Sequence, residues 1–311
     1  MKYDWIAGVG GIGRGEVFRL IGNHTLGREE SRSAVLTDFK DYCKAHIILS
    51  YPAKLVGQDI PVYILGKVGN DERGQGLIEE MNSINLNTEF IGRSDKPTMY
   101  SVCFLYEDGN GGNITTCNDA CSDVDFEFLK QSIDTIIERH GNKGLLLGAP
   151  EVTLKERMKL LSYAKSKGVK TFASVLTCEA EEFIDNNYID YLDFLSVNSD
   201  EIETLTKKTD FDYFVKKDIV LIVTKGKNGL EYYVNGQVNK VSAVETEVIS
   251  TAGAGDALLG GVISAYANGK KICECIKIGT YCSAFAVSSK HTIPDNFSKE
   301  KLINKIQGDL L

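Results

Sequence analysis

The sequence predicts an α/β protein built on a doubly wound, mainly parallel sheet with helices on both faces. Short apolar runs alternate with helical patterns along most of the 311 residues, which is typical of repeated βαβ units. One strong hairpin signal, Asn235-Gly236, interrupts this alternation within residues 229–243. Two further segments, 15–41 and 98–117, alternate polar and apolar residues without a helical period. We expect these two segments to add strands to one side of the core.

The expected strands are short apolar runs bounded by turn residues. They cover residues 5–9, 61–67, 145–147, 169–173, 194–197 and 219–224. Helices are expected between them, for example over 74–81 and over 153–167, where Leu154, Met158 and Leu161 share one face. The sequence contains no internal repeat or low-complexity linker, so we expect one domain over residues 1–311. The added strands would be insertions at about 12–41 and 97–122.

The charge balance limits the general partners. Acidic residues outnumber basic ones by 43 to 35, which gives a formal net charge of −8. This excess argues against nucleic acid and against an anionic membrane surface. The sequence shows neither a signal-peptide pattern nor a run of roughly 20 apolar residues, so we expect a cytoplasmic protein. A phosphorylated ligand is still compatible with an acidic chain if backbone N–H groups build its site.

Eight cysteines are too sparse in a chain of this length for a disulfide framework. The close pairs Cys117/Cys121 and Cys273/Cys275 leave a metal site open as an interpretation. No histidine lies near either pair in the sequence, however, and neither spacing is usual for zinc. Reduced cysteines are the favoured interpretation.

The most informative stretch covers residues 248–268, VISTAGAGDALLGGVISAYAN. A turn of small residues at 251–256 opens a helix rich in alanine, glycine and leucine. Successive backbone N–H groups and the positive end of the helix dipole there suit a transferring phosphoryl group. Asp256 could then take the proton of an acceptor hydroxyl as a general base. The alternative is an aspartate that only caps the helix after a glycine loop.

The turn 251–256, followed by Gly260-Gly261, resembles the C-terminal signature of the ribokinase-like (PfkB) carbohydrate kinases. That signature is Asp-Thr-x-Gly-Ala-Gly-Asp and an apolar run that ends in a glycine pair. Three other motifs agree in order and spacing: Asn198-Ser199-Asp200-Glu201 with the family's Asn-x-x-Glu, residues 224–229 with its Thr-x-Gly-x-x-Gly, and residues 68–74 with its Gly-x-Asp-x-x-Gly. The resemblance extends from Gly8 to about Ser289. It implies a ribokinase-like fold, an α/β core with a small β-sheet lid formed by the two inserted segments.

The resemblance also implies an ATP-dependent kinase that uses Mg²⁺. Asp256 matches the family's general base, and its anion hole matches Ala252, Gly253, Ala254 and Gly255. Asn198 and Glu201 match the residues that hold Mg²⁺ and its waters beside the ATP phosphates. Taken alone, this pair is more typical of a helix start with an acidic first turn.

Other residues match the nucleotide side of the family's site. Thr224, Gly226 and Gly229 match residues that line the phosphates and the adenosine. In the helix expected over 272–288, Gly279 and Ser283 are candidates for the wall of the adenine pocket. Small residues on a buried helix are more often there for packing.

The N-terminal half departs from the family's pattern. Gly13 stands where the family's first strand carries an aspartate that binds sugar hydroxyls. The Gly-Gly-x-x-x-Asn substrate helix of the family is missing from residues 41–50. The strand and the helix would still face the acceptor. The candidate contacts are Gly11, Gly13, Asp38, Asp41, Lys44 and His46. A histidine at this place is more often an ordinary half-buried residue.

Two further expectations come from the resemblance. Ser250 replaces the aspartate that usually precedes the threonine of the signature, which argues against activation by potassium. Lid strands of the family often pair between subunits, because an exposed sheet edge invites partners. We therefore expect a homodimer through the lid.

The sequence favours an ATP-dependent kinase that phosphorylates a hydroxyl of a small sugar or sugar-like molecule. One alternative is a nucleoside kinase of the same family. The other is a ribokinase-like binding or regulatory protein that has lost acceptor chemistry. The base and the anion hole favour a kinase, whereas the missing aspartate and substrate helix favour the binding protein.

Overall fold

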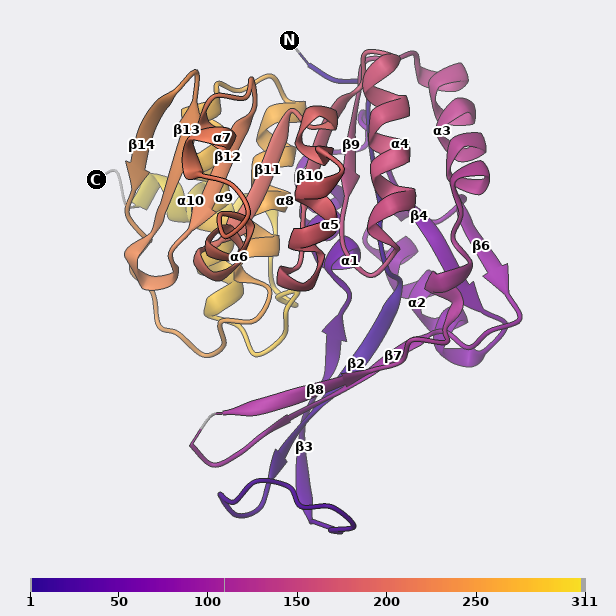
Figure 1. Cartoon of the computed structure of the whole chain (residues 1–311), viewed down its shortest axis with the longest axis vertical. Helices are drawn as coiled ribbons and strands as arrows, with labels where there is room; N and C mark the ends of the chain where they lie inside the picture. The colour runs from indigo at the N-terminus through magenta and orange to yellow at the C-terminus, as the bar shows by residue number, and fades with distance from the viewer. Residues whose placement is uncertain (1, 109, 309–311) are drawn as a thin grey trace.

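The computed structural model describes residues 2–108 and 110–308 (Figure 1). Residue 109, inside the second predicted insertion, and residues 1 and 309–311 of the predicted domain lie outside the described residues. A central sheet with helices on both faces forms the body, and a second, smaller sheet projects from one side of it (Figure 1). Over the described ranges, none of the helices combines the length and the apolar character needed to cross a membrane.

The central sheet has ten strands in the order β14-β13-β12-β11-β10-β9-β1-β4-β5, with β6 also paired to β4. The strands are β1 (Trp5–Val9), β4 (Val62–Gly69), β5 (Leu86–Asn87), β6 (Ile91–Ser94), β9 (Gly144–Gly148), β10 (Lys170–Ser174), β11 (Phe194–Asn198), β12 (Val220–Thr224), β13 (Leu230–Val234) and β14 (Gln237–Val241). All are parallel to their neighbours except β13 and β14. The strand order reverses between β1 and β9, and ligands of such sheets bind at the carboxyl ends of the strands beside this point.

The apolar strands are buried on both faces, so each face of the sheet has its own core and its own helices. One core includes residues of α1 (Lys44–Leu55), α2 (Glu72–Ser83), α8 (Ala254–Ala267), α9 (Ile272–Val287) and α10 (Lys299–Gly308). The other includes residues of α3 (Phe126–His140), α4 (Leu154–Ser166), α5 (Ala180–Asp185), α6 (Ser199–Leu205) and α7 (Phe211–Val215). Short 3₁₀ turns lie at Ala120–Asp123, Thr177–Glu179, Tyr188–Tyr191 and Gly226–Asn228.

Local sequence explains how these elements begin and end. Helix α3 starts after Asp125, whose carboxylate accepts a hydrogen bond from the backbone N–H of Phe128, and stops at Gly141 with φ 80°. The hairpin expected at Asn235-Gly236 is confirmed, since it joins β13 to β14 with φ values of 51° and 74°. Positive φ at both turn residues matches the twist of the two strands.

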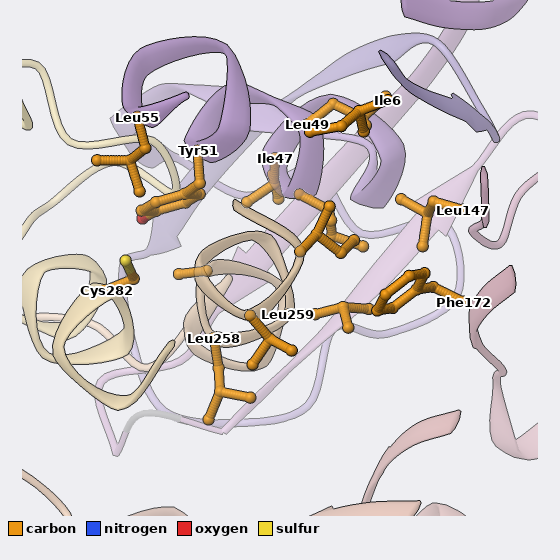
Figure 2. Close-up of a cluster of buried hydrophobic side chains, with 14 of the residues drawn as sticks. Ile6, Ile47, Leu49, Tyr51, Leu55, Leu147, Phe172, Leu258, Leu259 and Cys282 are labelled. Atoms are coloured by element: carbon orange, nitrogen blue, oxygen red, sulfur yellow. The ribbon is translucent and has the colours of Figure 1, made fainter. Parts of the chain in front are cut away.

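Helix α8 is packed tightly between α1 and α9. A Cβ atom on Gly260 would lie 2.4 Å from the carbonyl oxygen of Ile48 in α1, and one on Gly261 would lie 2.7 Å from Sγ of Cys282 in α9. Because Gly260 and Gly261 have no side chains, the backbone of α8 can lie close to both α1 and α9. Figure 2 shows the resulting core, in which these helices and the sheet contribute Ile47, Leu49, Tyr51, Leu55, Leu258, Leu259, Cys282, Ile6, Leu147 and Phe172.

The small sheet has the order β3-β2-β7-β8 and is formed by the two segments that the sequence predicts as insertions. Its strands are β2 (Gly13–Leu20), β3 (Ala34–Tyr42), β7 (Met99–Leu105) and β8 (Gly111–Thr115). Strand β2 follows β1 after three residues, and β3 leads directly into α1. The small sheet is thus attached at the carboxyl end of the central strand β1 (Figure 1).

Candidate active site

Asp256 lies in the first turn of α8 and is buried. The residue that caps this helix is Gly253, with φ 73°, and no side chain caps it. The alternative in which Asp256 serves as the helix cap is therefore wrong. Its carboxylate instead faces Lys44, the first residue of α1, with 3.7 Å between Oδ1 and Nζ.

The turn in front of α8 has the features of an anion site. The first N–H groups of a helix have no acceptor within the helix, and the dipole of α8 adds partial positive charge there. A Cβ atom on Gly255 would meet no atom within 4 Å, so this residue of the turn faces open space. The backbone N–H of Ala252 donates a hydrogen bond to Oγ of Ser250 at 3.3 Å. The predicted anion hole, Ala252 to Gly255, thus faces open space at Gly255, next to Asp256.

The side chain of Lys44 interacts with several acidic side chains at this end of the sheet. Its pKa is raised, first by Asp256 and also by Glu151 and Glu201, while burial opposes these charges. The sequence names Lys44 only as one of several candidate contacts. Its pairing with Asp256 depends on how α1 and α8 pack, which no local pattern reports.

Glu151 is a site residue that sequence reasoning missed. It follows β9, its φ is 76°, and its two carboxylate oxygens lie 3.2 and 3.4 Å from the backbone N of Lys44, which donates to them. Burial is the main cause that raises the pKa of Glu151 to about 7; Asp256 raises it further and Lys44 opposes the shift. The available signal was its position, because it follows an apolar strand whose carboxyl end lies beside that of β1.

Gly11, between β1 and β2, and Gly13, the first residue of β2, have no space for a side chain. A Cβ atom on Gly11 would lie 2.5 Å from Cβ of Glu151, and one on Gly13 would lie 2.6 Å from the carbonyl oxygen of Met99. The two strand ends are also joined directly, since the N–H of Gly11 donates to the carbonyl oxygen of Pro150 at 3.0 Å. A carboxylate is therefore present in this part of the site, but β9 supplies it and β1 does not.

The two aspartates of β3 have different partners. Oδ1 of Asp38 lies 2.8 Å from Nδ1 of His291 and accepts hydrogen bonds from the backbone of residues 39 and 40. Asp41 pairs across the small sheet with Gly15 and accepts a hydrogen bond from the thiol of Cys103 at 3.1 Å. Burial, together with the charge of Asp38, raises the pKa of Asp41. Asp41 shares its face of the sheet with Gly15 and Gly13.

His46 lies in the interior of the protein, and this corrects the expectation of a substrate contact. Its exposed fraction is 0%, and among the described residues neither ring nitrogen has a hydrogen-bond partner. The ring packs against Tyr42, with 4.4 Å between the ring centroids. Burial lowers the pKa of His46 to about 3, so it is neutral and enclosed by packed side chains. We do not include it in the site.

Asn198 and Glu201 form a reciprocal cap at the start of α6. Oδ1 of Asn198 accepts from the N–H of Glu201, and Oε2 of Glu201 accepts from the N–H of Asn198, both at 2.8 Å. Burial raises the pKa of Glu201. Within residues 2–108 and 110–308, no cluster of three or more His, Cys, Asp or Glu side chains is arranged to hold a metal. Two oxygen donors of this kind fit Mg²⁺ held mainly by water and phosphate.

The loop that the sequence predicts to bind the nucleotide follows β12. Thr224 ends that strand beside Asn198, its partner in β11. Gly226 has φ 54° and a Cβ on it would meet no atom within 4 Å, whereas Gly229 has φ 81° and approaches the carbonyl oxygen of Val241. Gly226 therefore faces open space, and Gly229 is needed where β14 leaves the sheet.

The two candidates on α9 have unequal placements. A Cβ atom on Gly279 would lie 2.6 Å from the carbonyl oxygen of Leu258, so its lack of a side chain is explained by the contact with α8. Ser283 is half-buried on the same helix. The role of Gly279 and Ser283 in an adenine pocket stays a prediction.

The fold and the arrangement at this end of the sheet suit phosphoryl transfer. A buried carboxylate lies next to an open helix N-terminus, at the carboxyl end of a parallel sheet, with oxygen donors for a hard cation on the neighbouring strand. The model of the pfkB family carbohydrate kinases matches residues 50–299. The chain belongs to this family of kinases, which transfer a phosphoryl group to an alcohol.

The chain is also similar to proteins named as sugar and nucleoside kinases. The chain is 26% identical over 265 residues to the probable chloroplastic fructokinase-6 of Arabidopsis thaliana, covering 76% of this chain and 67% of the relative. It is 23% identical over 253 residues to a nucleoside kinase of Methanocaldococcus jannaschii, covering 78% and 79%. Its fold matches the structure of Arabidopsis thaliana ribokinase complexed with ribose and ATP, with a TM-score of 0.75, 20% identity and coverage of 97% and 99%.

Proposed function

We propose that the protein transfers the γ-phosphoryl group of ATP to a hydroxyl of a small sugar or sugar-like molecule, with Asp256 as the general base. The observation that carries this proposal is the position of Asp256, buried in the first turn of α8 beside the open space at Gly255. An acceptor hydroxyl at the carboxylate would face a phosphoryl group held by the backbone N–H groups of the turn.

The nucleotide would lie along the carboxyl ends of β11 and β12. Thr224 and Gly226 would line it, and Gly229 shapes the loop. Asn198 and Glu201 would hold Mg²⁺ through water, and the ion, when bound, neutralises charge on the phosphates. Backbone N–H groups of the turn Ala252 to Gly255 would bind the γ-phosphoryl oxygens and stabilise their charge during transfer. Those of Ala252 and Ala254 would first exchange the acceptors that they have within the turn, Oγ of Ser250 and the carbonyl oxygen of Thr251.

The acceptor would lie between the body and the small sheet. Glu151 from β9 and Asp41 from β3 are the carboxylates that we assign to its hydroxyl groups. The small sheet would cover the acceptor and exclude water, which protects ATP from hydrolysis. Asp256 takes the proton from the attacking hydroxyl, and the oxygen then attacks the γ-phosphorus in line with the leaving ADP.

The alternative acceptor is a nucleoside, as the name of the archaeal relative suggests. Both acceptors present a ribose-like ring with several hydroxyl groups, so the same carboxylates serve either. The alternative of a binding protein without acceptor chemistry is disfavoured, because α8 holds both the base and an open anion site. The cytoplasmic location stays a prediction.

The test is ADP release from ATP and Mg²⁺ across a panel of sugars, sugar alcohols and nucleosides. With the best acceptor, Asp256→Asn should lower kcat by about 10²–10⁴-fold, the usual loss for a general base. The ATP dissociation constant and the melting temperature should change little, because asparagine has a similar size. Asp212→Asn is the matched control, since Asp212 lies in the first turn of α7 and is exposed. A D256N variant that keeps most of its kcat would overturn the assignment.

A further inference from the structure

The first residue of α1 reaches the predicted base. Nζ of Lys44 lies 3.7 Å from Oδ1 of Asp256, and the side chains are 32% and 11% exposed. The two helices are held at a fixed separation, because Gly260 of α8 lies against the backbone of α1 at Ile48. The ion pair therefore joins two rigid elements in a mostly buried place, where charges are screened less by solvent.

Asp256 has an acidic environment apart from Lys44. Glu151 approaches from the loop after β9 and Glu201 from α6, and the charge of Asp256 raises the pKa of both carboxyl groups. Tyr51, from α1 itself, is the other titratable group that interacts with Asp256, and burial keeps it neutral by raising its pKa well above the usual value. Burial also raises the pKa of Asp256, and Lys44 is what lowers it.

We propose that Lys44 is a positioning residue that keeps Asp256 ionised and aimed at the acceptor hydroxyl, and so sets the lower pH limit of phosphoryl transfer. This proposal rests on the proposed function, in which Asp256 is the base. A buried carboxylate without a cation takes up a proton, because burial disfavours its charged form. A protonated Asp256 cannot accept the proton of the acceptor. Lys44 therefore extends transfer to lower pH without itself touching the reacting atoms.

The first experiment needs no acceptor. Urea unfolding is followed for the wild-type protein and for Lys44→Met, Asp256→Asn and the double variant at pH 5 and pH 8. K44M should lower the urea midpoint, and more so at pH 8, where a lone buried carboxylate would be forced to ionise. In the D256N background the same substitution should have a much smaller effect. Lys54→Met, which removes a lysine from the other end of α1, should show no coupling to D256N.

The second experiment is the pH profile of kcat/KM with the acceptor found in the panel. K44M should move the acid limb of the profile upward by about one pH unit or more, which is about a tenfold loss at a fixed pH on that limb. At high pH the variant should approach the wild-type rate. Lys44→Arg keeps the charge and should restore the wild-type limb.

The outcomes separate the two proposals. If no acceptor is phosphorylated by any variant but the stability coupling is present, the proposed function fails and the ion pair stands as structural only. If transfer occurs and K44M lowers the rate by the same factor at every pH, or raises the KM for ATP alone, Lys44 acts on the phosphates and this proposal is overturned. Equal effects of K44M with and without D256N would also overturn it.

Discussion

Nδ1 of His291 lies 2.8 Å from Oδ1 of Asp38, and this contact fastens the small sheet to the segment after α9. Two neighbouring contacts support it: the hydroxyl of Thr292 donates to the carbonyl oxygen of Lys40 at 3.1 Å, and Lys40 pairs with Asp295 at 2.8 Å. Thr292 also lies against Gly253 at the start of α8, where a Cβ would be 3.2 Å from Cβ of Thr292. The small sheet is thereby linked to the proposed anion hole.

We expect His291→Ala to lower the free energy of unfolding by about 1–3 kcal/mol, because it leaves the buried carboxylate of Asp38 without its side-chain partner. Urea denaturation measures the change, and hydrogen exchange should show faster opening of β3. Asp295→Asn is the control, since Asp295 lies 3.7 Å from Nε2 of the same ring but is 62% exposed. It should change stability by less than about 1 kcal/mol. Unchanged exchange in β3 of H291A would contradict this prediction.

Replacing Gly260 by alanine should force α1 and α8 apart, since the new Cβ would fall 2.4 Å from a backbone oxygen that cannot move freely. Overpacking of this kind lowers the free energy of unfolding by about 1–3 kcal/mol, as thermal or urea melting would report. Gly76→Ala in the exposed part of α2 is the matched control, because its Cβ would meet no atom within 4 Å. That substitution should raise stability by about 0.5–1 kcal/mol. If Gly260→Ala and Gly76→Ala changed the free energy of unfolding alike, α1 and α8 would not be closely packed in solution.

Stability should fall as the pH rises through the range in which Glu151 titrates. Burial raises the pKa of Glu151 from 4.5 to about 7, so the folded state binds its proton more tightly than the unfolded state. Its favourable contribution is therefore complete below about pH 4.5 and is lost as the pH approaches 7. Glu151→Gln should remove this pH dependence. Between pH 4.5 and 7.5, the free energy of unfolding of the variant should therefore rise relative to that of the wild-type protein by on the order of 1–3 kcal/mol. Parallel stability profiles of the two proteins would contradict the shift.

The small sheet exposes apolar side chains on its edge strands, which supports the homodimer that we propose. Ile114 on β8 is 66% exposed, and Val35 and Phe39 on β3 are 56% and 50% exposed. Ile114→Lys should shift the protein from dimer toward monomer in light scattering at micromolar concentration, because charge on an edge strand opposes pairing. Val238→Lys, on the edge strand β14 of the central sheet, is the control and should leave the mass unchanged. A wild-type protein that is monomeric would remove the basis of this prediction.

The sequence predicts the periodic parts of the molecule well. The runs at 5–9, 194–197 and 219–224 fall on β1, β11 and β12, and the helix expected over 153–167 is α4, Leu154–Ser166. The two irregular segments do form a second sheet. These elements are predictable because alternation and helical period are local properties of a sequence.

The part that could not be predicted depends on which loops and helix ends meet. Glu151 reaches the site through a left-handed backbone conformation after β9, and no periodicity reports that conformation. The side chain of Lys44 reaches Asp256 because α1 and α8 pack closely at Gly260, which brings the first turns of the two helices together. His46 illustrates the opposite case: a residue type suited to chemistry that tertiary packing encloses in the core.

Strand β1, residues 5–9, lies inside the central sheet between β4 and β9. Strands β9 to β14 are neighbours in the sequence as well as in space, and each of their connections is much shorter than the stretch of chain between β1 and β9. By contrast, Trp5 pairs with Gly144, and its ring fills the space over that glycine. Contacts between such distant segments form slowly, because a long loop must be closed first. During synthesis, β1 is made before β9 and can complete its pairing only after the middle of the chain has followed.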